Sequence, residues 1–345
     1  MTRPDLSLVV AVRNQLPYNQ LFLESLGAHT HTASELIVVD NSSADGSTEL
    51  YRRHGAEVIP TFGNLCYPEA MNLGLRKATR RYVGFVNNDV YLGVGWDEAV
   101  LDAMEREHLD VACPSGVEKM LTRELTARAY ARWDLVKRAG GAVRHVEDLR
   151  RLIRAMYGDW EGFCRQIRTL FQGRMVPGIV GSCVVVRRAF IDSLGGWDPR
   201  VQSGDWDLYL TIRDRIQRAG CGRPPMVVSW AYVHHFIRAT AKTERAPFTC
   251  QHPRLSVEDK WGRAVVQRLW SDPEQVANRP RLLRNPAAYL RRRAQRTLAK
   301  WRRVTGLARA RLVGLPDPEG FLALLRTEAA KMDSARIQAS VARNQ

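Results

Sequence analysis

The sequence predicts an α/β fold in which helices flank a mostly parallel β-sheet. Three short runs rich in β-branched residues, 6–12, 35–40 and 82–87, are separated by segments long enough for helices. This alternation is typical of parallel sheets that are buried between layers of helices. Because ligands of such sheets bind beyond the carboxyl ends of the strands, we expect a binding site where the runs end. Polar residues stand at all three ends: Arg13, Asn14, Asp40, Asn41, Asn88 and Asp89.

The composition is that of a globular, intracellular protein. The chain has 345 residues, 45% of them hydrophobic, and can bury a large core. Its six cysteines are scattered, without the close pairs of a zinc site or the density of a disulfide-rich secreted protein. No run approaches the roughly 18 apolar residues of a membrane span, and no signal peptide is recognisable. We therefore expect a cytoplasmic protein, either free or bound peripherally to the inner face of the membrane.

The basic charge is local. The formal net charge is +16, but residues 279–311 contain twelve Lys and Arg and no acid, so the rest of the chain carries +4. Apolar residues recur in this stretch at the spacing of a helix. Three interpretations remain open: packing on the preceding domain, binding to an anionic membrane surface, or binding to nucleic acid. The apolar stripe consists of Leu290, Ala294, Leu298, Trp301, Val304, Ala308 and Leu312.

The chain is expected to form one domain with a helical insertion and a helical extension. After Pro114 the residues become charged and rich in Leu, Ala and Arg, with the period of helices. Strand-like residues return at 183–186, and a strand over 226–233 delivers His234 and His235 at its end. We predict a domain over 1–260, with the insertion at 115–176, and a helical, basic C-terminal extension over 261–345.

Six segments, in order, resemble family 2 glycosyltransferases, which have the Rossmann-like GT-A fold. They are 8–14, 37–47, 64–74, 85–96, 181–198 and 205–220. The resemblance implies an enzyme that moves a sugar from a nucleoside diphosphate sugar, UDP- or dTDP-linked by preference, to a hydroxyl acceptor such as a glycan or lipid-linked glycan. It also implies that residues 1–114 form the nucleotide-sugar-binding half of the domain and residues 177–260 the acceptor and catalytic half.

The resemblance assigns the nucleotide sugar to the polar strand ends. Asp40 corresponds to the carboxylate that contacts the base or ribose. The alternative is a strand-to-helix turn, and this is the interpretation we favour for Asp45 and Ser47, as capping residues. The residues assigned to nucleotide-sugar binding are Ala11, Val12, Arg13, Asn14, Asp40, Asn41, Asn72, Asn87 and Asn88.

The resemblance also implies a divalent cation, Mn²⁺ or Mg²⁺. Asn87-Asn88-Asp89 stands where the family usually has a D-x-D or N-N-D motif. A cation there stabilises the charge on the departing diphosphate, and hard cations favour carboxylate oxygen. Asp89 is the expected ligand, completed by His235 or His234, of which the other is a buried structural histidine. The alternative for the tripeptide is an Asx-type turn after a buried strand.

An inverting transfer requires a carboxylate that removes the proton of the acceptor hydroxyl. The resemblance implies Asp205 as this base, with Asp207 as the alternative, although Gly204 stands where the family often has Glu. Both aspartates are also typical of the first turn of a helix, where they favour the helix dipole. Four residues are assigned to the acceptor side, and the Trp at 197 fits a core anchor equally well. They are Gly181, Ser182, Trp197 and Trp206.

Two rival functions remain open at this point. One is transfer to nucleic acid or protein, and the other is nucleotide-sugar binding without catalysis. A nucleotidyltransferase is disfavoured, because residues 11–15 lack the glycines of a phosphate-binding loop. The sequence leaves the oligomeric state open.

Overall fold

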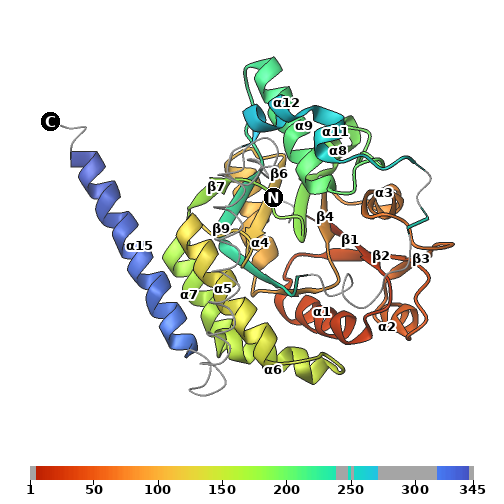
Figure 1. Cartoon of the computed structure of the whole chain (residues 1–345), viewed down its shortest axis with the longest axis horizontal. Coiled ribbons are helices and arrows are strands. Elements are labelled where there is room, and N and C mark those ends of the chain that lie inside the picture. The colour runs from red at the N-terminus through yellow and green to blue at the C-terminus, as the bar shows by residue number, and fades with distance from the viewer. Residues whose placement is uncertain (1–4, 238–247, 250–251, 271–316, 342–345) are drawn as a thin grey trace, which may run out of the picture.

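The computed structural model describes residues 5–237, 248–249, 252–270 and 317–341 (Figure 1). Within these ranges the centre is a nine-stranded sheet with the order β3-β2-β1-β4-β8-β6-β9-β5, and β7 pairs with β9. The strands are β1 (Leu6–Val12), β2 (Ser34–Asp40), β3 (Glu57–Pro60), β4 (Tyr82–Val86), β5 (Val90–Leu92), β6 (Val111–Ser115), β7 (Met175–Pro177), β8 (Cys183–Arg187) and β9 (Met226–His235).

The predicted α/β class is confirmed, but the sheet is mixed rather than mostly parallel. Strands β3, β2, β1 and β4 pair in parallel, as the alternation with helices predicts. Strand β8 then runs antiparallel to both β4 and β6. Strand β9 is parallel to β6 but antiparallel to β5 and β7. Local periodicity does not encode the direction in which a strand returns to the sheet, so the sequence could not predict these reversals.

The described helices are α1 (Leu16–His29), α2 (Ser47–Arg53), α3 (Tyr67–Lys77), α4 (Trp96–Arg106), α5 (Arg123–Ala139), α6 (Val146–Tyr157), α7 (Trp160–Phe171), α8 (Arg188–Ser193), α9 (Gly204–Ala219), α11 (Val257–Trp261), α12 (Arg263–Leu269) and α15 (Pro318–Val341). They cover both faces of the sheet. In β1, Leu8 and Val10 belong to one apolar core and Val9 to the other, which is the alternation of a strand buried on both sides.

Helices α5, α6 and α7 occupy the stretch predicted as an insertion, and they share a core with the sheet. Trp133 of α5 and Tyr157 of α6 are buried with β9 residues in one continuous apolar cluster. Helix α15 lies along these helices and extends beyond them (Figure 1). Its Phe321 stacks on Phe163 of α7, with ring centroids 5.9 Å apart. The basic stretch 279–311 and its apolar stripe lie outside the described residues.

Within those ranges, every helix is too short or too polar to cross a lipid bilayer.

Candidate active site

The polar strand ends meet at one edge of the sheet. Parallel pairing places Val12, at the end of β1, beside Asp40, at the end of β2. Strand β8 begins at the same edge, because Val86 pairs with Cys183. The backbone N–H of Asn87 donates to the carbonyl of Ser182 over 2.9 Å. Residues from four segments far apart in sequence thus border one region, as the strand-end argument predicts.

Asp89 and His235 face each other at this edge. Strands β5 and β9 pair antiparallel immediately after Asp89, and the N–H of Phe236 donates to the Asp89 carbonyl over 2.9 Å. The Asp89 Oδ1 and His235 Nε2 atoms are 3.1 Å apart. Both side chains are largely buried, with 8% and 13% of their surface exposed. The structure therefore brings together the carboxylate and one of the two histidines assigned to the metal.

Glu118 is a third member of this cluster, and sequence reasoning missed it. It lies in the turn Gly116–Lys119 that follows β6, and its Oε2 is 2.7 Å from His235 Nδ1. Burial by itself would lower the pKa of His235, but the carboxylates of Asp89 and Glu118 outweigh it and raise this pKa to about 10. The sequence carried no signal for Glu118, since one acid in a turn has no periodic context.

His234 points away from this cluster, because successive strand residues alternate between faces. Its Nδ1 lies 2.8 Å from the Tyr157 hydroxyl, and Trp133 packs edge-on at 4.2 Å between ring centroids. Burial holds the pKa of His234 well below its usual value, so the ring is neutral. His234 is thus the buried structural histidine of the pair, and His235 is the one beside Asp89.

Asp205 is the second residue of α9 and borders a cavity of about 190 Å³. Its carboxylate accepts the backbone N–H of Trp206. A Cβ at Gly181 would collide with this carboxylate, so only glycine allows the approach. Removal from water, with a contribution from the charge of Glu118, raises the pKa of Asp205 to about 6.

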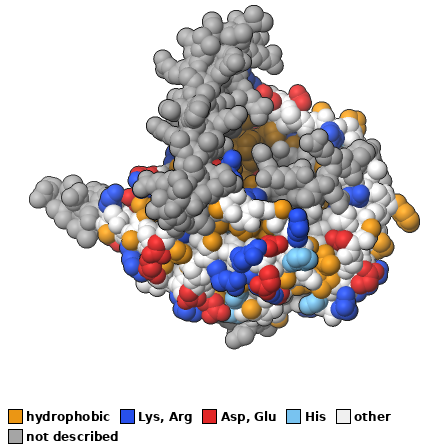
Figure 2. All heavy atoms as spheres, turned by 60° about the horizontal axis from the view of Figure 1, so that its bottom comes forward, with side chains coloured by type: hydrophobic (Ala, Val, Ile, Leu, Met, Phe, Trp, Pro, Cys, Tyr) orange, Lys and Arg blue, Asp and Glu red, His pale blue; other side chains and the backbone are white. Residues whose placement is uncertain are grey.

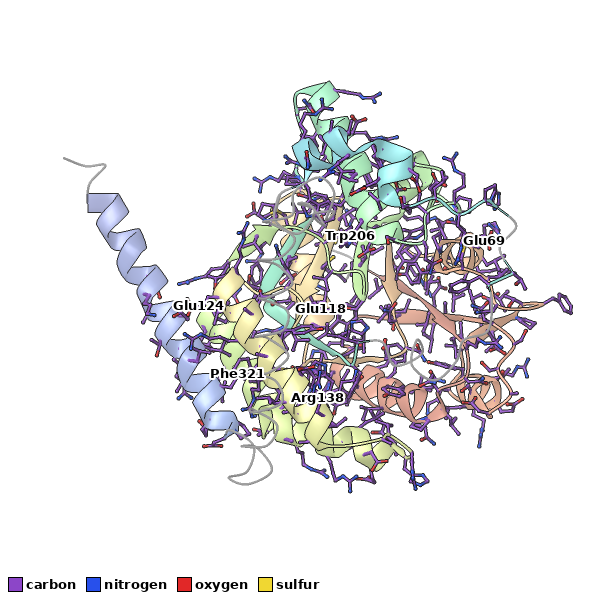
Figure 3. All side chains as sticks on the ribbon, in the orientation of Figure 1. Glu69, Glu118, Glu124, Arg138, Trp206 and Phe321 are labelled. Atoms are coloured by element: carbon purple, nitrogen blue, oxygen red, sulfur yellow. The ribbon has the colours of Figure 1, made fainter. Side chains whose placement is uncertain are left out.

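The same cavity carries an aromatic wall. Trp206 is 37% exposed, and its ring centroid lies 4.8 Å from that of Trp270. Figure 3 labels Trp206, on α9, and Glu118, on the loop after β6, in the same central part of the molecule. The residues that line the cavity are Glu118, Lys119, Gly178, Ile179, Val180, Gly181, Asp205, Trp206, Tyr209 and Trp270.

Asp207, the alternative base, is held in a structural contact. Lys260 Nζ and the Trp261 indole N–H each lie 2.7 Å from one of its two carboxylate oxygens. Lys260 also pairs with Asp198 over 2.8 Å. Asp207 is buried and does not line the cavity that Asp205 borders. Of the two aspartates, Asp205 lines this cavity and Asp207 does not.

The two polar residues at the end of β2 organise the neighbouring loops. Asp40 accepts the N–H of Ser43 over 3.0 Å and the hydroxyl of Thr48 over 2.6 Å. The Asn41 side chain donates to the Leu65 carbonyl over 3.2 Å and accepts the hydroxyl of Thr61 over 3.0 Å. These contacts form the strand-to-helix turn that the sequence offered as the alternative. They leave Asp40 at the sheet edge, beside the end of β1.

The loop after β1 is tied to the same turn. Arg13 donates to the Asn41 carbonyl over 2.7 Å. Asn14 has a positive φ of 53° and accepts the N–H of Ala44 over 2.7 Å. Asp45 accepts the N–H groups of Leu16, at the start of α1, and of Ser47, at the start of α2. Asp45 thus accepts the first N–H of two helices, although the N-cap positions are Gln15 and Gly46 and Ser47 is the first residue of α2.

Three further residues that the sequence assigned to the site make contacts inside the fold, next to the polar ends of the strands. Asn72 donates to the carbonyl of Trp197 and accepts its N–H, both over 2.8 Å, and so binds α3 to the segment before α9. Trp197 is buried edge-on against Phe85 at 4.9 Å, as a core anchor is. Asn88 donates to Asn19 over 2.7 Å. The structure therefore places Asn72, Trp197 and Asn88 in contacts that support the edge.

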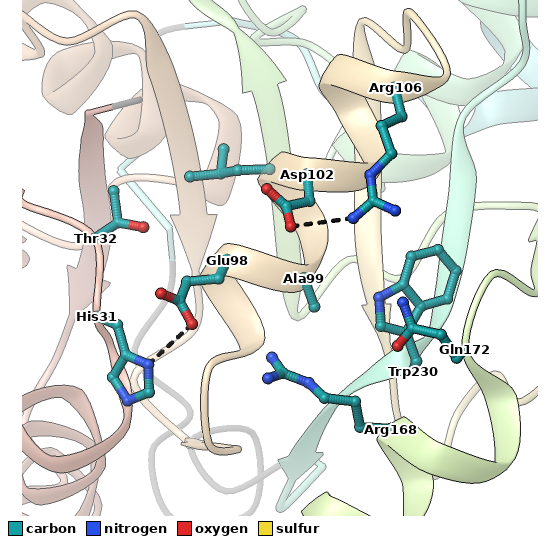
Figure 4. A pocket seen from close by; sticks show the side chains of 10 residues that line it. His31, Thr32, Glu98, Ala99, Asp102, Arg106, Arg168, Gln172 and Trp230 are labelled. Carbon is teal, nitrogen blue, oxygen red and sulfur yellow. Dashed lines mark hydrogen bonds and ion pairs between the residues drawn. The ribbon is translucent and has the colours of Figure 1, made fainter. Parts of the chain in front are cut away.

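A larger pocket of about 390 Å³ lies elsewhere, between α4, α7 and β9 (Figure 4). Its charged side chains form ion pairs or hydrogen bonds within the protein. His31 lies 3.0 Å from Glu98, and Arg106 donates to Asp102 over 3.2 Å. Arg168 donates to the Gly95 carbonyl over 2.7 Å. None of the site residues predicted from sequence lines this pocket.

The family model described as glycosyl transferase family 2 matches residues 7–195, more than half of the chain. The chain belongs to this family, as the six sequence segments implied. It is therefore a glycosyltransferase, in a family that uses nucleotide sugars.

One relative and one solved structure are similar to this chain. The N-acetylglucosaminyl-diphospho-decaprenol L-rhamnosyltransferase of Mycobacterium tuberculosis is 26% identical over 312 residues, which cover 81% of this chain and 93% of that protein. Among solved structures, the mannosyltransferase PcManGT from Pyrobaculum calidifontis in complex with GDP-Man and Mn²⁺ has a TM-score of 0.49 and 14% identity, covering 98% of this chain and 87% of that one.

Proposed function

We propose that this enzyme transfers a sugar from a nucleoside diphosphate sugar to an acceptor hydroxyl, with a divalent metal ion and with inversion at the anomeric carbon. The observation that carries the proposal is the convergence of two acidic centres at one edge of the sheet. Asp89 stands with His235 at one centre, and Asp205 borders the cavity at the other. Transfer requires both a centre that stabilises the leaving diphosphate and a base that accepts the hydroxyl proton.

The first centre fits Mn²⁺ or Mg²⁺. Asp89 supplies the carboxylate oxygen that hard cations prefer, and His235 Nε2 faces it over 3.1 Å. When bound, the cation would neutralise the charge that develops on the diphosphate. No group of three or more His, Cys, Asp or Glu within the described ranges is arranged to hold a metal alone. We infer that diphosphate and water would supply the remaining ligands, next to the loops of Arg13 and Asp40.

The second centre fits general-base catalysis. At pH 7 a carboxyl with a pKa of about 6 is mostly ionised, yet it is a stronger base than an ordinary Asp. Asp205 would accept the proton of the acceptor hydroxyl as oxygen attacks the anomeric carbon. Trp206 and Trp270 border the same cavity and offer apolar ring surface to a sugar of the acceptor.

We propose a lipid-linked glycan as the acceptor. The mycobacterial relative supports this choice, since its name specifies a diphospho-decaprenol acceptor and the transfer of rhamnose. A dTDP- or UDP-linked sugar is the donor that we propose. Because such an acceptor is held in a bilayer, the enzyme would work at the cytoplasmic surface of the membrane.

The proposal is tested by the release of nucleoside diphosphate from UDP- and dTDP-sugars with Mn²⁺, in the presence and absence of a synthetic polyprenyl-diphosphate sugar. We expect Asp89→Ala and Asp205→Asn each to lower the acceptor-dependent rate at least about 100-fold. Asp89→Ala removes the proposed metal ligand, and Asp205→Asn removes the proposed general base, whose loss typically costs 10²–10⁴-fold. Asp102→Asn is the control, because this carboxylate is exposed and lies in the remote pocket of Figure 4.

Turnover that is undiminished in Asp89→Ala would refute the assignment of the metal centre. Undiminished turnover in Asp205→Asn would refute the assignment of the base. Release that never depends on the acceptor, with any of these donors, would contradict the proposed acceptor class while leaving both centres open to test.

A further inference from the structure

We propose that Glu118 is a positioning residue that orients the imidazole of His235 for metal binding. This inference rests on the proposed function, because it concerns the metal centre assigned there. It starts from the contact of His235 with Glu118, in which Nδ1 lies 2.7 Å from Oε2. The other ring nitrogen, Nε2, lies 3.1 Å from Asp89. The imidazole is thus held between two carboxylates, one on each nitrogen.

The two carboxylates have different roles because only one of them is at the proposed metal position. An ionised carboxylate only accepts hydrogen bonds, so the nitrogen that faces Glu118 carries a proton. Nε2 faces the Asp89 carboxylate in the same way and also carries a proton when no metal is bound. A cation bound to Asp89 would displace the proton on Nε2, whereas the proton on Nδ1 would stay in the hydrogen bond to Glu118. Metal-bound histidines almost always donate their second nitrogen to a carboxylate, carbonyl or water, which fixes the ring orientation.

The backbone holds Glu118 in this position. In its turn, Gly116 and Lys119 exchange backbone hydrogen bonds of 3.2 Å and 3.1 Å, and the Ser115 hydroxyl donates to the Lys119 carbonyl. A Cβ at Gly116 would lie 2.8 Å from the Val233 carbonyl, so glycine permits the turn to lie directly against β9. The turn and the strand that carries His235 are therefore packed as one unit.

The degree of burial separates this contact from an ordinary surface ion pair. The side chains of His235 and Glu118 are 13% and 33% exposed. Glu124, on α5, is a useful contrast, because it is 55% exposed and pairs with Arg128 one turn along the same helix. Exposed pairs of that kind contribute little, whereas shielded, charge-assisted hydrogen bonds are stronger and hold geometry. Figure 3 shows Glu118 near the centre of the molecule and Glu124 toward α15.

The test measures Mn²⁺ affinity directly, by electron paramagnetic resonance of free Mn²⁺ in titrations of the full chain at a fixed, saturating concentration of uridine diphosphate, corrected for the Mn²⁺ that uridine diphosphate alone binds. Glu118→Met keeps the side-chain length but removes the acceptor, and we expect it to weaken Mn²⁺ binding about 10- to 100-fold, as losses of such partners do. Glu118→Gln keeps an acceptor without the charge, so we expect a smaller loss. Glu124→Met is the matched control and should bind Mn²⁺ like the wild type.

Asp89→Ala completes the set of variants, because it tests the proposed metal centre separately from the role of Glu118. If Asp89→Ala loses Mn²⁺ binding but Glu118→Met does not, the positioning role is overturned and the metal centre stands. If Asp89→Ala binds Mn²⁺ like the wild type, the metal centre of the proposed function fails. If Glu118→Met does not fold by circular dichroism, Glu118→Ala is measured in its place, with the same two outcomes.

Discussion

At the scale of single residues, Asp205 and Asp207 show how packing separates two similar side chains. Both lie in the first turn of α9, two positions apart. Asp207 accepts hydrogen bonds from Lys260 and the Trp261 indole, whereas Asp205 borders a cavity. Removal from water raises the pKa of Asp205 to about 6, against the lowering effect of the hydrogen bond from the Trp206 N–H. This difference supports Asp205 as the base.

The raised pKa of Asp205 predicts the acid limb of the pH–rate profile. A base must be deprotonated, so kcat/KM should fall about tenfold per pH unit below about 6 and level off above it. The measurement is acceptor-dependent turnover between pH 4.5 and 8, at fixed ionic strength. A limb with an apparent pKa near 4, the ordinary value of an aspartate, would contradict the assignment.

A thermal measurement provides the control, because it does not depend on turnover. The folded-state pKa of Asp205 lies above its unfolded value, so this carboxyl contributes stability below the unfolded pKa and loses it as the pH rises through about 6. Asp205→Asn stays neutral at every pH. We therefore expect the variant to gain thermal stability relative to the wild type on going from pH 4 to pH 8, while its turnover is lost.

At the scale of elements, one ionic contact docks α11 on α9. Lys260 lies 2.7 Å from Asp207 and 2.8 Å from Asp198, and it is 22% exposed. Asp207 is buried, so a variant that removes Lys260 leaves this carboxylate without the cation that it hydrogen-bonds, while the Trp261 indole still donates to it. Trp270, at the end of the same C-terminal segment, contacts Trp206. The ionic contact of Lys260 with Asp207 and Asp198 therefore supports the aromatic wall of the cavity.

Lys260→Met should lower the free energy of unfolding by about 2 kcal/mol, the usual magnitude for a hydrogen bond to a charged group. Urea unfolding followed by tryptophan fluorescence measures the change. Arg218→Met is the matched control, because Arg218 also pairs with an aspartate, over 2.8 Å, but is 78% exposed. Surface pairs contribute at most about 1 kcal/mol. Equal losses in the two variants would contradict a structural role for Lys260.

At the scale of the whole molecule, the inserted helices and α15 share one apolar core with the sheet. Phe321, Leu322 and Leu325 of α15 belong to the same apolar core as the strands. The Arg132 guanidinium of α5 lies 5.8 Å from the Phe321 ring centroid. On the face shown in Figure 2, basic and acidic side chains of the described residues are intermixed. Helix α15 is therefore bound by apolar packing, to which Asp333 and Arg326 add polar contacts with Arg174 and Gln166.

Phe321→Ala should lower the free energy of unfolding by about 3 kcal/mol, because the ring is buried and its removal leaves a cavity between α15 and α7. Thr327→Ala, at an exposed position of the same helix, is expected to change it by less than about 0.5 kcal/mol. Urea unfolding measures both. If both variants match the wild type, α15 does not contribute to the stability of the folded chain.

Local sequence patterns predicted much of the fold but a smaller part of the site. The runs that end before Arg13, Asn41 and Asn88 are strands, and their polar ends meet. Local patterns predict such strands because burial and alternation depend on neighbouring residues. The antiparallel direction of β8 was missed, since it depends on how the chain returns after the inserted helices. Glu118 was missed because only the packing of its turn against β9 brings it to His235.

The sequence by itself determined the α/β class, the strands that carry the polar ends and the glycosyltransferase family, because each depends on residue types at short, ordered spacings. The tertiary structure alone decided which histidine faces Asp89, which aspartate borders the cavity, and that Glu118 joins them. Those distinctions depend on distance and on removal from water. Both arise only when segments far apart in the chain are packed together.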